Sequence, residues 1–217
     1  MVYPSARIHS RRVFFYQMKN IIKKRLILAT NSSRRVALLK TLGYCFDIIP
    51  HNIQESIPRN VLPTDLVQNL AFMKANDVAE RVNNAIIVSA DTLVFHKKNI
   101  IGKPKDARDA KRILSLLSNS RHSIFTGVCI IEMPSKKKLL RNEQTHITMK
   151  DISEEEIEAY IQSGEPMDKA GAYAIQGEGK KFIEEIDGSY SNVVGLPLEL
   201  VLEMLRNFIK DANAEKF

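Results

Sequence analysis

Hydroxyl and guanidinium groups follow directly on a short apolar run in the segment LILATNSSRR, residues 26–35. A strand that passes into a helix at Ser32 would point free backbone N–H groups and the positive end of the helix dipole outward, which forms an anion site. Arg34 and Arg35 are cations in the first helical turn, where the positive end of the helix dipole disfavours them. They are well suited to bind a phosphate held there. A solvated basic turn explains this segment equally well when it is taken alone.

A carboxylate ends the most apolar stretch of the chain, AIIVSAD at residues 85–91. Burying such a group is costly unless it is paired, bound to a metal or placed in a wet cleft. Asp91 is therefore a candidate metal ligand or general base. A cap at the end of a strand is the alternative interpretation.

Other polar residues are weaker candidates when each is taken singly, among them Lys74, Lys103 and Glu55. Gln176 lies in a segment rich in small residues, DKAGAYAIQG at 168–177, and its amide can both donate and accept hydrogen bonds. The chain has no GxxxxGK[ST] loop, no GxGxxG and no paired histidines. These absences exclude the common phosphate loops and a histidine-based zinc site.

Hydrophobic periodicity and breaker residues predict the elements that must position these groups. Strands are expected at 26–30, 44–49, 85–90, 123–132, 139–150 and 182–186, a hairpin at 92–101, and helices at 33–42, 64–83, 106–117, 153–161 and 196–209. This order predicts an α/β fold with a mixed, partly antiparallel twisted sheet and flanking helices. Because ligands collect at strand ends in such sheets, we expect the polar segments to share a cleft.

The net charge of +7 is concentrated near the N-terminus. Residues 1–46 hold ten of the 32 Lys and Arg residues and none of the 25 Asp and Glu residues. The charge distribution therefore argues against a broad nucleic-acid-binding face and predicts no nucleic-acid partner. No apolar run approaches the ~20 residues that span a bilayer, so no membrane association is expected.

Residues 1–17 are rich in arginine and free of acidic residues, and two interpretations stay open. They could be a transit peptide, or Met18 could be the true start. Cys45 and Cys129 lie far apart in apolar surroundings, which predicts buried free thiols and a reducing, cytoplasmic compartment.

Taken together, these stretches resemble the Maf family of nucleoside triphosphate pyrophosphatases, in order from about Leu26 to Ile209. The segments that carry the resemblance are LILATNSSRR, LAFMKA, SADT, IIGKPKDARDA, FTGV, GEPMDKAGAYAIQG and GSYSNVVGLPL. It implies a Maf/ITPase-like fold with two lobes around a deep cleft, and a homodimer. We expect a single catalytic domain at 21–210 between a loosely ordered N-terminal extension, 1–20, and a tail, 211–217.

The resemblance also implies an activity, the hydrolysis of a nucleoside triphosphate to the monophosphate and pyrophosphate with a divalent metal, Mg²⁺ or Mn²⁺. The implied roles are phosphate binding for Ser32, Arg34, Arg35, Lys74 and Lys103, proton acceptance for Asp91, and metal binding for Asp91 and Glu55. Asp91 would activate a water that attacks the α-phosphorus.

Three positions resemble the branch of the family that acts on dTTP and UTP: Arg34, Thr92 and Gln176. A branch that acts on 7-methyl-GTP differs at the first arginine and has glutamate in place of the glutamine. Two positions depart from the family pattern. Ser33 replaces a usual proline, and Ala174 replaces a usual glycine, which questions a positive φ there.

Two hypotheses of other classes stay open at this point. The family's link to septum formation suggests a cell-division regulator that acts by binding a partner. The basic N-terminal segment suggests a nucleic-acid binder. Release of pyrophosphate from nucleotides distinguishes the first from an enzyme, and the salt dependence of nucleic-acid binding without residues 1–17 tests the second.

Overall fold

One mixed β-sheet organises the fold in the computed structural model, which describes residues 24–55, 61–97 and 99–208. Within these ranges seven strands form the sheet in the order β2-β1-β3-β5-β6-β7, with β4 paired to β3. The strands are β1 (Arg25–Leu28), β2 (Asp47–Ile48), β3 (Ala85–His96), β4 (Asn99–Ile101), β5 (Arg121–Glu132), β6 (Lys137–Met149) and β7 (Ile183–Asp187). β1 pairs in parallel with β2 and β3, and the other pairs are antiparallel. The predicted mixed, partly antiparallel sheet is confirmed.

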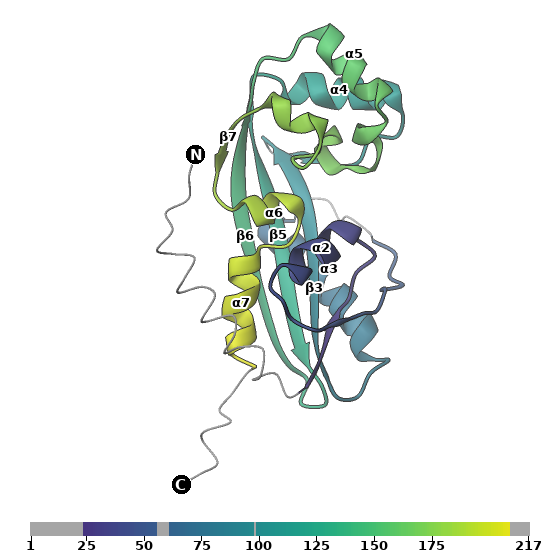
Figure 1. Ribbon diagram of the computed structural model, residues 1–217, viewed down its shortest axis with the longest axis vertical. Helices are drawn as coiled ribbons and strands as arrows, with labels where there is room; N and C mark the ends of the chain where they lie inside the picture. Colours follow the sequence, from purple (N-terminus) through teal and green to yellow (C-terminus); the bar gives the residue numbers. More distant parts are fainter. Residues whose placement is uncertain (1–23, 56–60, 98, 209–217) are drawn as a thin grey trace.

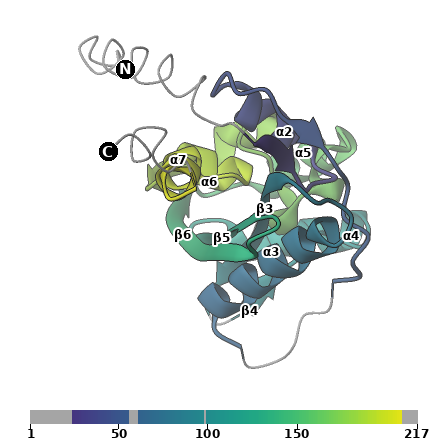
Figure 2. The ribbon, with the colours of Figure 1, turned by 90° about the horizontal axis from the view of Figure 1, so that it is seen from below.

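Helices cover both faces of this sheet and one of its ends (Figure 1). They are α2 (Ser33–Lys40), α3 (Pro63–Ala79), α4 (Ala107–Leu117), α5 (Glu154–Gln162), α6 (Tyr190–Val194) and α7 (Leu198–Arg206), with short 3-10 segments η1 (Glu165–Asp168), η2 (Ala170–Ala172) and η3 (Glu178–Phe182). α3 lies on one side of the sheet, and α2 and α7 lie on the other (Figure 2). Within the described ranges, none of these helices has the length and apolar character needed to cross a bilayer.

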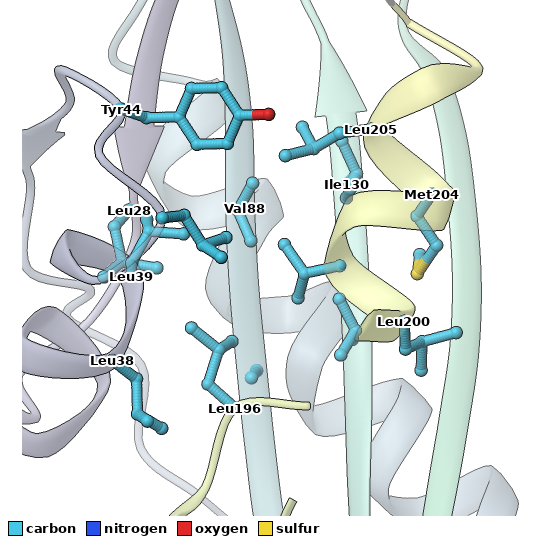
Figure 3. Close-up of a cluster of buried hydrophobic side chains, with 14 of the residues drawn as sticks. Leu28, Leu38, Leu39, Tyr44, Val88, Ile130, Leu196, Leu200, Met204 and Leu205 are labelled. Carbon is cyan, nitrogen blue, oxygen red and sulfur yellow. The ribbon is translucent and has the colours of Figure 1, made fainter. Parts of the chain in front are cut away.

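Alternate residues of the central strands form separate cores on the two faces of the sheet. Leu28, Val88 and Ile130 pack with α2 and α7 (Figure 3). Their neighbours Ile27 and Ile87 point the other way and pack with α3. A strand buried on both faces is expected to be apolar throughout, which explains the continuous runs LIL and AIIV.

The long strands β3, β5 and β6 pass through two lobes. Toward one end of the sheet, Val94, Ile124 and Ile147 belong to a core that includes residues of α4 and α5. Farther along the same strands, Val88 and Ile130 belong to the core under α2 and α7. Figure 1 shows the α4–α5 lobe at the top and the other helices below it. The expected division into two lobes is confirmed.

A gap in strand pairing lies between the two lobes. β1 pairs with β3 up to Leu28 and Val88, and β4 pairs with β3 from Val94 onward. Among the described residues, positions 89–93 of β3 therefore have a strand partner on the β5 side alone. Side chains from both faces of β3 can reach this open edge, which is where a polar site can form beside a sheet that is otherwise covered.

The structure corrects the expected end of the central strand. The strand predicted at 85–90 continues to His96, so Asp91 lies in the middle of β3, opposite Gly127 of β5, and does not end it. The charged residue interrupts the apolar pattern of the sequence, but it does not interrupt the hydrogen-bonded ladder. A nearby cation makes this burial tolerable, as the site shows below.

Three local expectations are also corrected. The strand predicted at 44–49 is reduced to β2, two residues long, and Cys45 is exposed, although both cysteines are free thiols as expected. The closing helix predicted at 196–209 is α7, which begins after Pro197, and the short α6 precedes it. The expected extension, 1–20, and tail, 211–217, lie outside the described residues.

Substitution of Gly127 by alanine should destabilise the protein, because a Cβ at Gly127 would overlap the Val67 carbonyl of α3. Backbone shifts that relieve such overlap cost about 1–3 kcal/mol. For a domain of this size, Tm should fall by about 2–4 °C per kcal/mol. Thermal unfolding measures the change. Gly102→Ala is the matched control, since a Cβ there meets no atom within 4 Å. Equal Tm values for both variants would contradict the close approach of α3.

Candidate active site

A cleft of about 480 Å³ opens at the unpaired edge of β3, between the two lobes. This volume lies within the range of small-molecule sites. It is lined by every site residue that the sequence suggested, namely Ser32, Arg34, Arg35, Glu55, Lys74, Asp91, Thr92, Lys103 and Gln176. The expectation that separate polar segments share one cleft is therefore confirmed.

A buried ammonium group links two carboxylates at the floor of the cleft. Lys74 extends from α3, and its Nζ lies 2.5 Å from Oδ1 of Asp91 and 2.7 Å from Oε1 of Glu55. The Lys74 and Asp91 side chains are 4% and 6% exposed, whereas Glu55 is 43% exposed. Oδ2 of Asp91 is buried and has no hydrogen-bond partner among the described residues. An acceptor oxygen therefore stays available beside the cleft.

The charge of Lys74 also acts on the loop above it. Burial raises the pKa of Glu55, but the hydrogen bond and charge of Lys74 outweigh burial and lower that pKa overall. Burial and then Lys74 lower the pKa of His51, which lines the same cleft. Glu55 is thus held in its anionic form and His51 in its neutral form.

Two directed hydrogen bonds fix Arg35, which lines the cleft. Its Nε donates to the Gly195 carbonyl at 2.8 Å, and its Nη2 donates to Oγ1 of Thr92 at 3.1 Å. Oγ1 of Thr92 also lies 2.9 Å from Oγ1 of Thr126. Burial lowers the pKa of Arg35, Asp91 raises it and Arg34 lowers it. A partly buried guanidinium near a second one would be stabilised by an anion in the cleft.

The N-terminus of α2, which carries Arg35, lines the cleft as well. Ser32 is the N-cap, and its Oγ accepts a hydrogen bond from the Arg35 amide at 3.4 Å. The capping role leaves the amides of Ser33 and Arg34 at the open end of the helix. Arg34 lines the cleft and, after stronger local causes, contributes to lowering the pKa of Asp168 in the other lobe.

Several cleft residues were not singled out from the sequence. Lys169 forms an ion pair with Asp168, and both line the cleft with His51 and Tyr173. The family-like segment GEPMDKAGAYAIQG contains three of these residues, so the motif could have been used to predict that they line the cleft. Nothing in the local sequence marks His51, because its place depends on the fold of the 49–55 loop against α3.

The fold accommodates both departures from the family pattern. Ser33 occupies the first helical position of α2, where a serine is tolerated. Positive φ angles in the 168–177 segment occur at Gly171 (79°) and Ala172 (57°), not at Ala174. The doubt about Ala174 is therefore resolved, because no left-handed conformation is required there.

The charges around the cleft favour a polyanion. Five cationic side chains line it, against three carboxylates: Arg34, Arg35, Lys74, Lys103 and Lys169 against Glu55, Asp91 and Asp168. Lys74 is bound to two of these carboxylates, whereas the arginines and Lys103 stand around the helix end and the rim. A chain of phosphates can be held by guanidinium groups and helix amides at once.

Comparison with known proteins identifies the family. Residues 25–208 match the Maf family, described as Maf-like protein. The chain therefore belongs to the Maf family, and the resemblance seen in the sequence motifs is confirmed.

Three bacterial relatives are each named dTTP/UTP pyrophosphatase. The protein of Dictyoglomus turgidum is 46% identical over 86% of this chain and 97% of its own length. The corresponding values are 44%, 84% and 94% for Caldicellulosiruptor saccharolyticus, and 43%, 85% and 90% for Bacillus cereus. Among solved structures, the Staphylococcus aureus Ham1 protein aligns with a TM-score of 0.47 and 13% identity, over 85% of this chain and 100% of that chain.

Replacement of Lys74 by methionine should destabilise the fold by about 3–5 kcal/mol, because the buried Asp91 carboxylate then loses its partner. Urea denaturation at neutral pH measures the loss. The double variant Lys74→Met/Asp91→Leu should recover most of it, since no unpaired charge remains. Lys111→Met, which removes a partly exposed lysine paired with the exposed Glu154 and Glu158, should change stability little. A Lys74→Met protein as stable as the wild type would contradict the buried pair.

Proposed function

We propose that this protein hydrolyses nucleoside triphosphates, with dTTP and UTP as preferred substrates and modified pyrimidine nucleotides as further candidates, to the monophosphate and pyrophosphate. The observation that carries the proposal is the buried Asp91 carboxylate, which keeps one oxygen unpartnered in a cleft rich in cations. The relatives align with most of this chain and with nearly their own full length. Their name, dTTP/UTP pyrophosphatase, supports the choice of substrates.

The triphosphate would lie along the cationic side of the cleft. Arg34, Arg35 and the first amides of α2 would hold phosphate oxygens at one wall, and Lys103 would reach them from the rim. Ser32 contributes by capping the helix, which keeps those amides oriented. Fixed donors of this kind stabilise the charge that develops in phosphoryl transfer and position the reacting phosphorus.

Asp91 would act as the general base. Its Oδ2 would accept a proton from a water molecule, whose oxygen then bonds to the α-phosphorus while the bond from that phosphorus to the bridging oxygen breaks and pyrophosphate leaves. Lys74 binds the other carboxylate oxygen and fixes its orientation. In this arrangement Lys74 acts on the substrate through Asp91 and Glu55, in addition to contributing positive charge.

A divalent cation, Mg²⁺ or Mn²⁺, fits the donor set of the cleft. The described residues contain no cluster of three or more His, Cys, Asp or Glu side chains suited to a metal. The unpartnered oxygen of Asp91 and the nearby Glu55 carboxylate could still hold Mg²⁺ together with substrate phosphates, the manner in which proteins commonly bind this ion. When bound, the ion would offset negative charge on the phosphates.

The base would be selected at the end of the cleft formed by the second lobe. The family resemblance assigns selection to Arg34, Thr92 and Gln176. Gln176 lies on the cleft in an exposed turn, where its amide can pair with a pyrimidine edge. Thr92 would act by holding Arg35 in place.

The same family membership supports two further proposals, a homodimeric assembly and a cytoplasmic location. Two free cysteines agree with a reducing compartment.

Purified protein should release pyrophosphate from dTTP and UTP faster than from dCTP, dATP or 7-methyl-GTP in the presence of Mg²⁺ or Mn²⁺. A coupled pyrophosphate assay over this panel measures the kcat/KM of each nucleotide. Chelation of the metal with EDTA should abolish turnover, because the cation offsets negative charge on the phosphates. If the protein hydrolyses none of these nucleotides, the proposed activity is refuted. That result would favour the hypothesis of a partner-binding regulator.

Substitution of Asp91 by asparagine should lower kcat for dTTP by about 100-fold or more, because the amide cannot accept the proton from water. Nucleotide binding should be retained, and fluorescence or calorimetric titration can check it. Asp187→Asn serves as the control, since Asp187 is an exposed residue paired with Arg121 at the end of β7. Wild-type turnover by the Asp91 variant, with unchanged binding, would show that another group activates the water.

A further inference from the structure

The turn that carries Gln176 depends on backbone contacts for its position. Gln176 is exposed and has no hydrogen-bond partner of its own among the described residues, although it lines the cleft. The orientation of its amide toward a base is therefore set by the chain on either side of it. That chain is irregular, since residues 173–177 lie between two short 3-10 segments, η2 and η3.

Tyr160 holds this chain on the N-terminal side of Gln176. Tyr160 lies near the end of α5, is fully buried and packs edge-on against the Phe182 ring at 5.1 Å between centroids. Its hydroxyl accepts a hydrogen bond from the Ala174 amide at 3.1 Å. The same hydroxyl donates to Oε1 of Glu165 at 2.7 Å, so the two side chains act as one unit.

Glu165 holds the chain on the C-terminal side. Its carboxylate accepts hydrogen bonds from the Glu178 amide at 3.0 Å and the Gly179 amide at 3.2 Å. The carboxylate also packs against Gly177, where a Cβ would overlap it. Burial raises the pKa of Glu165, but the bonds from Tyr160 and the two amides outweigh burial and lower it. A charged acceptor makes these bonds stronger than neutral ones.

We propose that Tyr160 and Glu165 form a positioning pair for base selection, which clamps the turn on both sides of Gln176 without touching the nucleotide. The inference rests on the proposed function, because it assumes that Gln176 contacts the base. The anchored amides bracket Gln176 within two residues before it and three after it. An error of about 1 Å at a selective amide is enough to lose discrimination.

Tyr160→Phe and Glu165→Gln remove the clamp with little change in volume. The first deletes the hydroxyl and keeps the ring against Phe182. The second places an NH₂ donor where three donors converge. Both variants should raise KM for dTTP about tenfold with a smaller change in kcat, and should lower the kcat/KM ratio of dTTP to dCTP by about tenfold, the change expected from one lost hydrogen bond of ordinary strength.

Two matched controls exclude a general effect of these substitutions. Tyr44→Phe removes a buried hydroxyl that has no partner in the described structure and belongs to the other lobe. Glu158→Gln changes an exposed glutamate of α5 that pairs with Lys111. Both controls should keep the wild-type ratio of dTTP to dCTP.

A double-mutant cycle tests whether the pair acts through Gln176. In a Gln176→Ala background, Tyr160→Phe should change the dTTP to dCTP ratio by less than about twofold, because the group it positions is already gone. A further tenfold loss would overturn the proposed route of action.

Hydrogen exchange provides a readout that does not need activity. The amides of residues 174, 178 and 179 should exchange about tenfold faster in both clamp variants, while α4 and the central strands keep their protection. Unchanged exchange at these amides would overturn the clamp itself. Selectivity that stays at the wild-type value in an active enzyme would overturn the role in base selection alone. Failure of the wild type to release pyrophosphate from any nucleotide would overturn the proposed function and that role together.

Discussion

The buried ion pair between Lys74 and Asp91 is the interaction on which the arrangement of the cleft depends. A carboxylate in the middle of a covered strand would be unstable in isolation. Lys74 makes it tolerable, and the lysine can reach it because α3 approaches β5 closely over Gly127. The close packing of α3 thus lets Lys74 reach Asp91, and Lys74 in turn lets the candidate base occupy a buried position in β3.

The same pair explains why several polar and charged side chains lie together in the cleft. Glu55 joins Lys74 from a loop, and Arg35 lies near enough for Asp91 to affect its pKa. On the opposite face of β3, Thr92 binds Arg35. The open edge of the strand lets groups from both faces meet, so one strand of the sheet supplies residues to both walls of the cleft.

Much of the fold could be predicted from the sequence, because local patterns encode it. The helix predicted at 153–161 is present as α5, and the strands predicted at 123–132 and 139–150 are present as β5 and β6, each within a few residues. The cleft residues were found through motifs. The place of Asp91 inside a strand was not, since it depends on a lysine 17 positions earlier in another element. His51 and the contacts between Tyr160 and the 174–179 segment are likewise set by tertiary packing.

The continuity of β3, β5 and β6 through both lobes has a mechanical consequence. Domains that close like a hinge do so around a few residues whose φ and ψ angles can change freely. Here the lobes share three long strands joined by two antiparallel ladders, β3 with β5 and β5 with β6, so rotation of one lobe against the other would have to bend the sheet itself. One continuous sheet therefore backs both lobes, and Lys103 and residues of the 168–177 segment line the cleft from outside the three shared strands.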